Sequence, residues 1–172
     1  MHRFPAFALL ALLPFLLSSC AGYTLGGQRP AHLAAVRSIA VPLAVNDTLT
    51  PRASVFTTNA VVDAITRDGS YQLAATGSAD AVLSLRLKSI SYGQRRSSRQ
   101  DSLRPEELEM RVNVSWQLTD ADNPLRILEK GSTLGRSSFF VADNLQKARD
   151  NALPDALRRM AETLTSRLAD GY

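Results

Sequence analysis

The chain contains one cysteine, Cys20, which directly follows an apolar run. A thiolate is a nucleophile that can form thioethers, bind metals or act in covalent catalysis. A disulfide within the chain is excluded because no second cysteine exists. Before Cys20 come a short basic start, Met1 to Arg3, and an apolar stretch from Phe4 to Leu17, an order typical of a secretion signal. A buried free thiol or a catalytic nucleophile remains an alternative, but neither explains a signal that ends on the cysteine.

The four residues Leu17-Ser18-Ser19-Cys20 resemble the bacterial lipobox, in which leucine and two small residues precede a cysteine. The resemblance implies that residues 1–19 are removed as a lipoprotein signal peptide. It also implies that Cys20 becomes a lipid anchor carrying a diacylglycerol and an acylated amine. Several acyl chains hold a protein firmly on a membrane, whereas one chain binds only reversibly. Ala21 stands where an aspartate would suggest inner-membrane retention, so we expect the outer membrane, on its periplasmic face.

The apolar stretch is too short to anchor the protein by itself. A helix needs about 20 apolar residues to cross a bilayer, and this stretch is shorter and interrupted by Pro5 and Pro14. Removal of residues 1–19 from the 172 leaves enough chain for one domain with a core. The net charge of +4 favours anionic partners. In a protein facing the periplasm we expect anionic lipid or lipopolysaccharide and no nucleic acid.

Groups that could support catalysis are sparse after Cys20. His32 is the only histidine there, and the chain has no His-Glu-x-x-His motif and no glycine-rich phosphate loop. A serine hydrolase would have to use His32, for which a solvated side chain is the simpler interpretation. We therefore expect no enzyme activity, no metal and no cofactor.

Basic residues concentrate in the middle of the chain. The connection from Gly93 to Ser102 is predicted to be a hairpin loop, and its arginines are Arg95, Arg96 and Arg99. Arginine can bind phosphate through two parallel hydrogen bonds, which suits such a loop to a phosphorylated glycolipid. A mobile, solvated loop is an equal alternative. Lys147 and Arg149 form a second basic group, for which an ordinary exposed helix face is the favoured interpretation.

Period-two alternation predicts the strands that must position these groups. The clearest case is 108–118, where Leu108, Met110, Val112, Val114, Trp116 and Leu118 alternate with polar residues. Shorter patterns predict strands at 71–75, 79–92 and 125–140, the last with a bulge near Gly131 or Gly135. The run 36–45 is predicted as one strand with Ile39, Val41, Leu43 and Val45 on one side. Pro42 in that run suggests a sheet edge or a bulge.

Two helices are predicted. Thr50-Pro51 is typical of a helix start, with Val55, Val62 and Ile65 on the buried stripe and Gly69 as the C-cap. The second helix begins near Asp143 and Gln146, and Pro154 predicts a kink or two helices that meet there. The order β-α-β-β-β-β-α predicts an α+β two-layer sandwich, with both helices on one face of a mostly antiparallel sheet. We expect a lipidated tether over 20–34 and a single domain over 35–172.

Several segments, taken in order, carry a family resemblance. The opening Cys20-Ala21-Gly22-Tyr23-Thr24-Leu25 is similar to a cysteine, glycine, aromatic, leucine pattern with Ala21 interposed. Ser38–Pro42 resembles a first strand that ends in a Val-Pro step, and Glu107–Val114 a central strand with a Glu-x-x-Met-x-Val pattern. Phe139-Phe140 precedes an acidic and amide stretch and the closing helix. Over its mature length the chain resembles the lipopolysaccharide-assembly lipoprotein family, LptE.

The resemblance implies a non-catalytic outer-membrane lipoprotein. Such a protein plugs a large outer-membrane β-barrel, LptD, and assists it in lipopolysaccharide assembly. The resemblance further implies that basic residues in the central hairpin loop, and in a Lys-Asp-Asn type step after the last strand, bind lipopolysaccharide. The residues at the matching positions are Arg95, Arg96 and Arg99, with Arg104 beside them, and Arg149 within Arg149-Asp150-Asn151.

Two other classes of function stay open. Small α+β lipoproteins also serve as accessory subunits of other envelope lipid transporters, or in cell-wall synthesis. A periplasmic hydrolase that uses a serine and His32 is the third class. Co-purification separates the first class from the second, because only a barrel partner would give a stable complex with an outer-membrane protein.

Overall fold

The computed structural model describes residues 29–97, 105–141 and 144–171. Cys20, Arg99 and Asp143 therefore lie outside the described residues. The elements in chain order are η2 (Ala31–Leu33), β1 (Ser38–Ala40), β2 (Val45–Asn46), α2 (Ala53–Asp68), β3 (Gln72–Leu73), β4 (Ala81–Ser97), β5 (Pro105–Asp120), β6 (Ile127–Phe140) and α3 (Leu145–Asp170).

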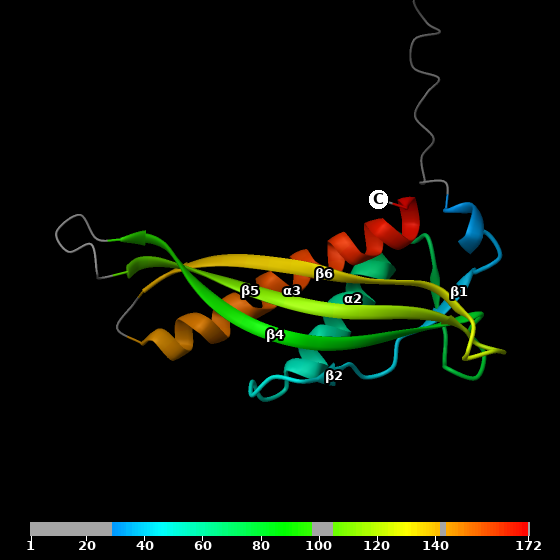
Figure 1. The fold of residues 1–172 in the computed structure, drawn as a ribbon, viewed down its shortest axis with the longest axis horizontal. Helices are drawn as coiled ribbons and strands as arrows, with labels where there is room; N and C mark the ends of the chain where they lie inside the picture. Colours follow the sequence, from blue (N-terminus) through cyan, green and yellow to red (C-terminus); the bar gives the residue numbers. More distant parts are fainter. Residues whose placement is uncertain (1–28, 98–104, 142–143, 172) are drawn as a thin grey trace, which may run out of the picture.

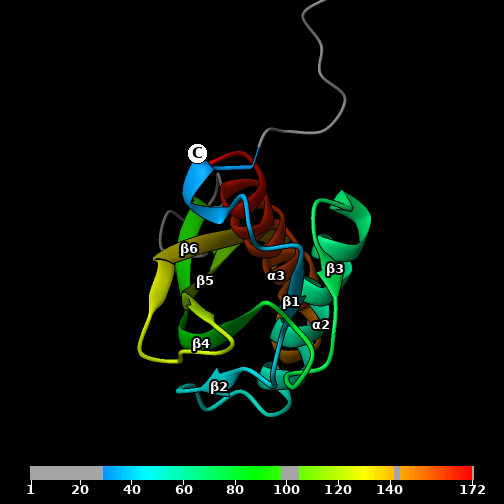
Figure 2. The same cartoon turned by 90° about the vertical axis from the view of Figure 1, so that its right-hand side faces the viewer.

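The predicted α+β sandwich is confirmed. One sheet has the strand order β3-β1-β4-β5-β6, and β2 pairs with β4 beside β1. The long strands β4, β5 and β6 pair antiparallel, whereas β1, β2 and β3 join in parallel. Both α-helices of the described residues lie on one face of the sheet, and the opposite face is open (Figure 2).

The first predicted strand is divided by Pro42. β1 ends at Ala40 and β2 begins at Val45, so Pro42 lies between the two strands rather than at an edge or a bulge. A proline cannot donate to the ladder, which interrupts the pairing there. The expected buried side is wrong beyond the break, because Leu43 is 64% exposed and Ala44 is buried instead.

The first helix begins later than expected. α2 starts at Ala53, and its N-cap is Arg52 in the left-handed conformation (φ 59°) rather than Thr50. The buried stripe differs in part from the predicted one, because Val55 is exposed, while Val61 and the predicted Ile65 are buried. Gly69 ends the helix as predicted, with a positive φ of 76° and its N–H donating to Ile65 O at 3.0 Å.

The core lies between the sheet and the helices. The inward side chains of β5 predicted from the alternation, from Met110 to Trp116 and Leu118, are buried. They meet the apolar stripe of α3, which is Leu153, Leu157, Met160, Leu164 and Leu168.

Glycine 135 is the place where α3 approaches β6 most closely. An added Cβ there would overlap the Ala156 carbonyl oxygen and lie 2.7 Å from Met160 Cβ. Gly135 is thus a packing site and not the predicted bulge. The register shift between β5 and β6 falls at Leu118/Thr119 instead.

The last helix is continuous. α3 runs from Leu145 to Asp170 with Pro154 inside it, so the alternative of two separate helices is wrong. Its N-cap is Asn144, whose side-chain oxygen accepts from the Lys147 backbone N–H at 2.9 Å. The helix leads from the tip of the β4–β5 hairpin to the opposite end of the molecule, where η2 and the C-terminus lie (Figure 1).

Candidate functional site

Of the predicted loop arginines, Arg95 and Arg96 lie on strand β4 of the hairpin that β4 and β5 form, and Arg99 lies outside the described residues. β4 continues to Ser97, so the expected loop over 93–102 is wrong for its first five residues. Gln94 pairs with Leu108 and Arg96 with Glu107, which leaves Arg95 as the extra residue of a bulge. Residues 93–97 are polar and show no apolar alternation, so the sequence pattern does not predict a strand there. Pairing with β5 extends β4 through this segment.

Arg95 bridges three strands at the hairpin end, by which we mean the paired ends of β4 and β5 at residues 92–97 and 105–110. Its Nη1 donates to Ser138 Oγ on β6, and its Nε lies 3.9 Å from Glu107 Oε1 on β5. Arg96 is exposed and forms no ion pair with the described residues. The two arginines therefore differ: Arg95 is partly neutralised, whereas Arg96 is available to an anion.

Arg149 reaches the same end of the molecule from α3. Its guanidinium carbon lies 4.4 Å from the centroid of the Tyr92 ring on β4, a cation–π contact. Tyr92 in turn packs edge-on against Phe139, with ring centroids 6.3 Å apart and planes at 88°. Arg149 Nε is buried without a hydrogen-bond partner in the described residues, and no carboxylate among them pairs with the side chain.

The predicted site residues lie at one end of the molecule but on two faces of the sheet. Tyr92 pairs with Met110 on the face covered by helices, so Arg149 approaches from that side. Arg95 contacts Ser138, which pairs with Glu109 on the open face. Because side chains alternate between faces along a strand, the two groups of cations flank the end of the sheet.

Two further arginines belong to this end and were not among the predicted site residues. Arg111 and Arg136 are directly opposite each other on the open face. Arg111 Nε donates to Glu109 Oε1 at 2.6 Å, and this hydrogen bond lowers the pKa of the Glu109 carboxyl. Arg136 forms no ion pair within 4 Å among the described residues, but its charge also lowers the pKa of the Glu109 carboxyl. The alternation over 108–118 already predicted a polar, outward position for Arg111.

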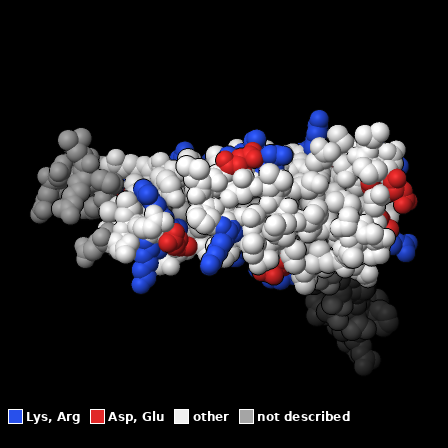
Figure 3. Space-filling model, turned by 90° about the horizontal axis from the view of Figure 1, so that it is seen from below, with Lys and Arg blue, Asp and Glu red and all other residues white. Residues whose placement is uncertain are grey.

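The hairpin end is thus rich in cations. The described basic residues there are Arg95, Arg96, Arg111, Arg136, Lys147 and Arg149, and the described acidic side chains that contact them are Glu107 and Glu109. Figure 3 shows basic side chains near this end, with an acidic group between them, and further basic and acidic groups along the rest of the view. Guanidinium groups in excess over carboxylates favour binding of phosphate.

His32 is engaged elsewhere. It belongs to η2, and its Nε2 lies 3.3 Å from Glu129 Oε2 at the far end of the molecule. Glu129 also contacts Arg167, so this is a surface ion-pair cluster. Among the residues that the structure describes, no three metal-ligating side chains converge.

Taken together, fold and site define a small α+β protein that presents arginines at one end. Residues 36–169 match the model of the family LptE, lipopolysaccharide-assembly. The chain therefore belongs to the LptE family, a family of non-enzymatic accessory lipoproteins of the cell envelope. A comparison with curated protein sequences gives no match.

Solved structures share the fold at low sequence identity. A protein of the DUF330 family from Xanthomonas campestris is 13% identical with a TM-score of 0.54, over 83% of this chain and 86% of that one. A minor lipoprotein from Acinetobacter baumannii is 13% identical with a TM-score of 0.52, over 78% and 93%. A candidate lipoprotein from Caulobacter crescentus is 20% identical with a TM-score of 0.52, over 76% and 87%. None of the helices in the described residues is both long and apolar enough to cross a bilayer.

Proposed function

We propose that the protein is an outer-membrane lipoprotein, anchored through Cys20 and facing the periplasm, that plugs an LptD-like β-barrel and assists lipopolysaccharide assembly. It binds lipopolysaccharide through Arg95, Arg96, Arg99 and Arg149. Membership of the LptE family supports the role in assembly and implies partners in the lipopolysaccharide-transport machinery. The lipobox-like sequence before Cys20 supports the anchor.

The state of Arg149 is the observation that carries the binding proposal. Its guanidinium is half-buried, stacked on Tyr92 and without a carboxylate partner in the described residues. A buried N–H without an acceptor costs about 1–3 kcal/mol. A bound phosphate would supply acceptors in the geometry that arginine prefers, and would recover that cost. Arg96, which is exposed and has no ion-pair partner among the described residues, supports the same ligand.

The shape of the domain is consistent with the plugging role. A barrel of many strands encloses a wide polar lumen, which an inserted domain can fill. A two-layer sandwich whose exposed side chains are largely polar can offer polar surface to such a lumen wall. A role in which the protein acts only on barrel folding would need no free cation at Arg149.

A binding experiment tests the lipid contact. Lipopolysaccharide binding by the lipidated protein in detergent is compared for wild type, Arg149→Glu, Arg95→Glu with Arg96→Glu, and the control Arg126→Glu. Arg126 is exposed on the β5–β6 turn, far from the hairpin end, and makes only a surface ion pair with Asp120. We expect about tenfold weaker binding for Arg149→Glu, equivalent to about 1.4 kcal/mol, and no change for Arg126→Glu. Unchanged binding by Arg149→Glu with an intact circular dichroism spectrum would refute this contact.

The partner needs a separate experiment. Crosslinking of the lipidated protein in outer membranes, followed by identification of the partner by mass, should return an outer-membrane β-barrel in a stoichiometric complex. Recovery of a cell-wall synthase or of another lipid transporter would instead support the alternative accessory role.

A further inference from the structure

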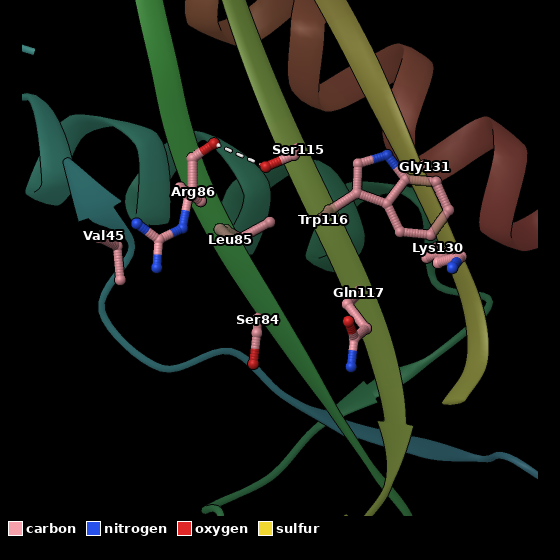
Figure 4. A pocket seen from close by; sticks show the side chains of 9 residues that line it. All are labelled: Val45, Ser84, Leu85, Arg86, Ser115, Trp116, Gln117, Lys130 and Gly131. Atoms are coloured by element: carbon pink, nitrogen blue, oxygen red, sulfur yellow. Dashed lines mark hydrogen bonds between the residues drawn. The ribbon is translucent and has the colours of Figure 1, made fainter. Parts of the chain in front are cut away.

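The open face of the sheet carries a groove of about 670 Å³ far from the hairpin tip. Its lining residues come from four strands, β2, β4, β5 and β6, and are Val45, Ser84, Leu85, Arg86, Ser115, Trp116, Gln117, Lys130 and Gly131 (Figure 4). This volume is in the range of small-molecule sites, about 300–1,000 Å³. The groove is separate from Arg149, which lies on the helix side.

The lining is polar and cationic. Ser84, Ser115 and Gln117 supply hydroxyl and amide groups that both donate and accept hydrogen bonds, on strands about 4.8 Å apart. Among the described residues, no acidic side chain lines the groove. Trp116 adds little surface, because it is 3% exposed and its Nε1 donates to Thr133 Oγ1 at 2.9 Å.

The two cations of the groove are in different states. Arg86 is held by an ion pair with Asp47, which does not line the groove: the Nη1 of Arg86 lies 2.8 Å from Asp47 Oδ1. The Asp47 carboxylate also forms an ion pair with Lys88. Lys130, which pairs with Gln117 across the β5–β6 ladder, has no ion-pair partner in the described residues. A ligand that contacts Gln117 would therefore meet an uncompensated ammonium group.

The same open face connects the groove to the hairpin end. From Ser115 to Glu109 the strand β5 covers six residues, about 20 Å. The outward side chains beside this path include Asn113, which accepts a hydrogen bond from Ser132 Oγ at 2.6 Å, and the cation Arg136. A ligand with phosphates at the hairpin end could thus extend a hydrophilic chain along the face.

We propose that this groove binds an acidic saccharide, namely the sugar portion of the lipopolysaccharide whose phosphates contact the hairpin end. The inference rests on the proposed function. Hydroxyl and amide groups match sugar hydroxyls, and Arg86 and Lys130 match phosphate or carboxylate substituents. A protein partner fits less well, because protein interfaces depend on aromatic and apolar anchors. The apolar anchor exposed here is Val45, and the aromatic Trp116 is buried.

Ligands with and without the core saccharide provide the test. Full-chain lipidated protein is titrated with lipopolysaccharide that carries its core sugars, with lipid A alone, and with the isolated core oligosaccharide. The variants are Lys130→Glu, Gln117→Leu, Arg149→Glu and the control Arg126→Glu, which has the same charge change as Lys130→Glu outside the groove. Thermal unfolding confirms that each variant folds.

We expect Lys130→Glu and Gln117→Leu to weaken binding of core-bearing lipopolysaccharide about five- to tenfold and to abolish binding of the core oligosaccharide. Their binding of lipid A should stay within twofold of wild type. Equal loss for lipid A and core-bearing ligand, or no loss for either, would overturn the saccharide site. Loss of the complex with the barrel protein, with saccharide binding intact, would assign the groove to a protein and also overturn it. If the wild-type protein bound no lipid A, the proposed function itself would be refuted. That result is distinguishable from failure of the saccharide site alone.

Discussion

The guanidinium of Arg149 lies 4.4 Å from the centroid of the Tyr92 ring, which joins α3 to β4 at the hairpin end. Fifty-six residues separate the two positions in the sequence. The contact fixes where the guanidinium points, because the ring limits its rotation on one side and Phe139 limits the ring itself. Tyr92 is therefore a positioning residue for the proposed lipid contact.

Replacement of Tyr92 tests this relationship. Tyr92→Ala removes both the cation–π and the edge-on contact, and should destabilise the domain by about 2 kcal/mol. It should also weaken lipopolysaccharide binding several-fold, because Arg149 loses its support. Tyr92→Phe keeps the ring and should restore both properties. Binding and denaturant unfolding measured together check this, and a Phe variant as weak as the Ala variant would contradict it.

The closeness of α3 and β6 makes Gly135 intolerant of a side chain. Gly135→Ala would place its Cβ against the Ala156 backbone and Met160, so α3 must shift. We expect a loss of about 1–3 kcal/mol in the free energy of unfolding. Gly77→Ala is the matched control, because nothing lies within 4 Å of its added Cβ, and it should change stability by less than about 0.5 kcal/mol. Equal denaturant midpoints for the two variants would argue against the close contact.

Hydrogen bonds to the Asp80 carboxylate stabilise the domain, and this stabilisation is lost at acid pH. Its carboxylate accepts from the Arg37 and Ser38 backbone N–H groups at 2.9 and 2.8 Å and from Ser38 Oγ, and these bonds lower its pKa. A lowered folded-state pKa gives stability that is present above the unfolded pKa, near 3.8, and is lost as the pH falls through the folded value.

Asp80→Asn should therefore be less stable than wild type near neutral pH, and the difference should shrink as the pH falls below about 4. Asp122→Asn is the control, because no hydrogen bond to its carboxylate occurs in the described residues. Urea unfolding at several pH values measures both. A difference between Asp80→Asn and wild type that stays constant from neutral to acid pH would contradict the assignment.

Tyr71 links the strand region to the end of α3. Its hydroxyl donates to Leu168 O at 2.6 Å, and burial raises its pKa to about 12. Tyr71→Phe should cost about 1 kcal/mol, since the Leu168 carbonyl loses its partner. A raised folded pKa means that this contribution is complete below pH 10 and is lost as the pH rises through about 12. Thermal unfolding of the two proteins at neutral pH checks the size of the effect.

Mass spectrometry tests the proposed anchor. The native protein should begin at Cys20 and carry a diacylglyceryl group on sulfur and an acyl group on the amine. Cys20→Ala should leave the signal uncleaved and remove the protein from the outer-membrane fraction. An unmodified thiol at the start of the native protein would contradict the anchor.

The strongest patterns in the sequence predicted the core of the fold. The unbroken alternation over 108–118 placed β5 and both of its faces correctly, because the inward residues from Met110 to Leu118 are buried and Leu108 is partly buried against the same core. The start of α2 was misplaced, since the backbone conformation of Arg52 overrode the capping preference of Thr50. The parallel pairing of β1 and β2 with β4 depends on long-range contacts that no local pattern encodes.

The site was predictable in part. The sequence identified Arg149 by position and Arg95 and Arg96 by composition, but not their environment. That Tyr92 supports Arg149 follows from how α3 packs on the sheet. That Arg95 is partly neutralised by Glu107 follows from the bulge in β4, which a polar sequence does not reveal.

The two ends of the described domain meet at one pole, where Gly171 lies near Pro30, and the cations lie at the other. α3 runs between the poles, and its 26 residues span about 39 Å. The chain from Cys20 to Arg29 can add at most about 30 Å. With the lipid anchor that we propose at Cys20, the length of the domain would limit how far from the membrane surface the arginines can reach. This limit on reach would be independent of how tightly the arginines bind the proposed phosphate.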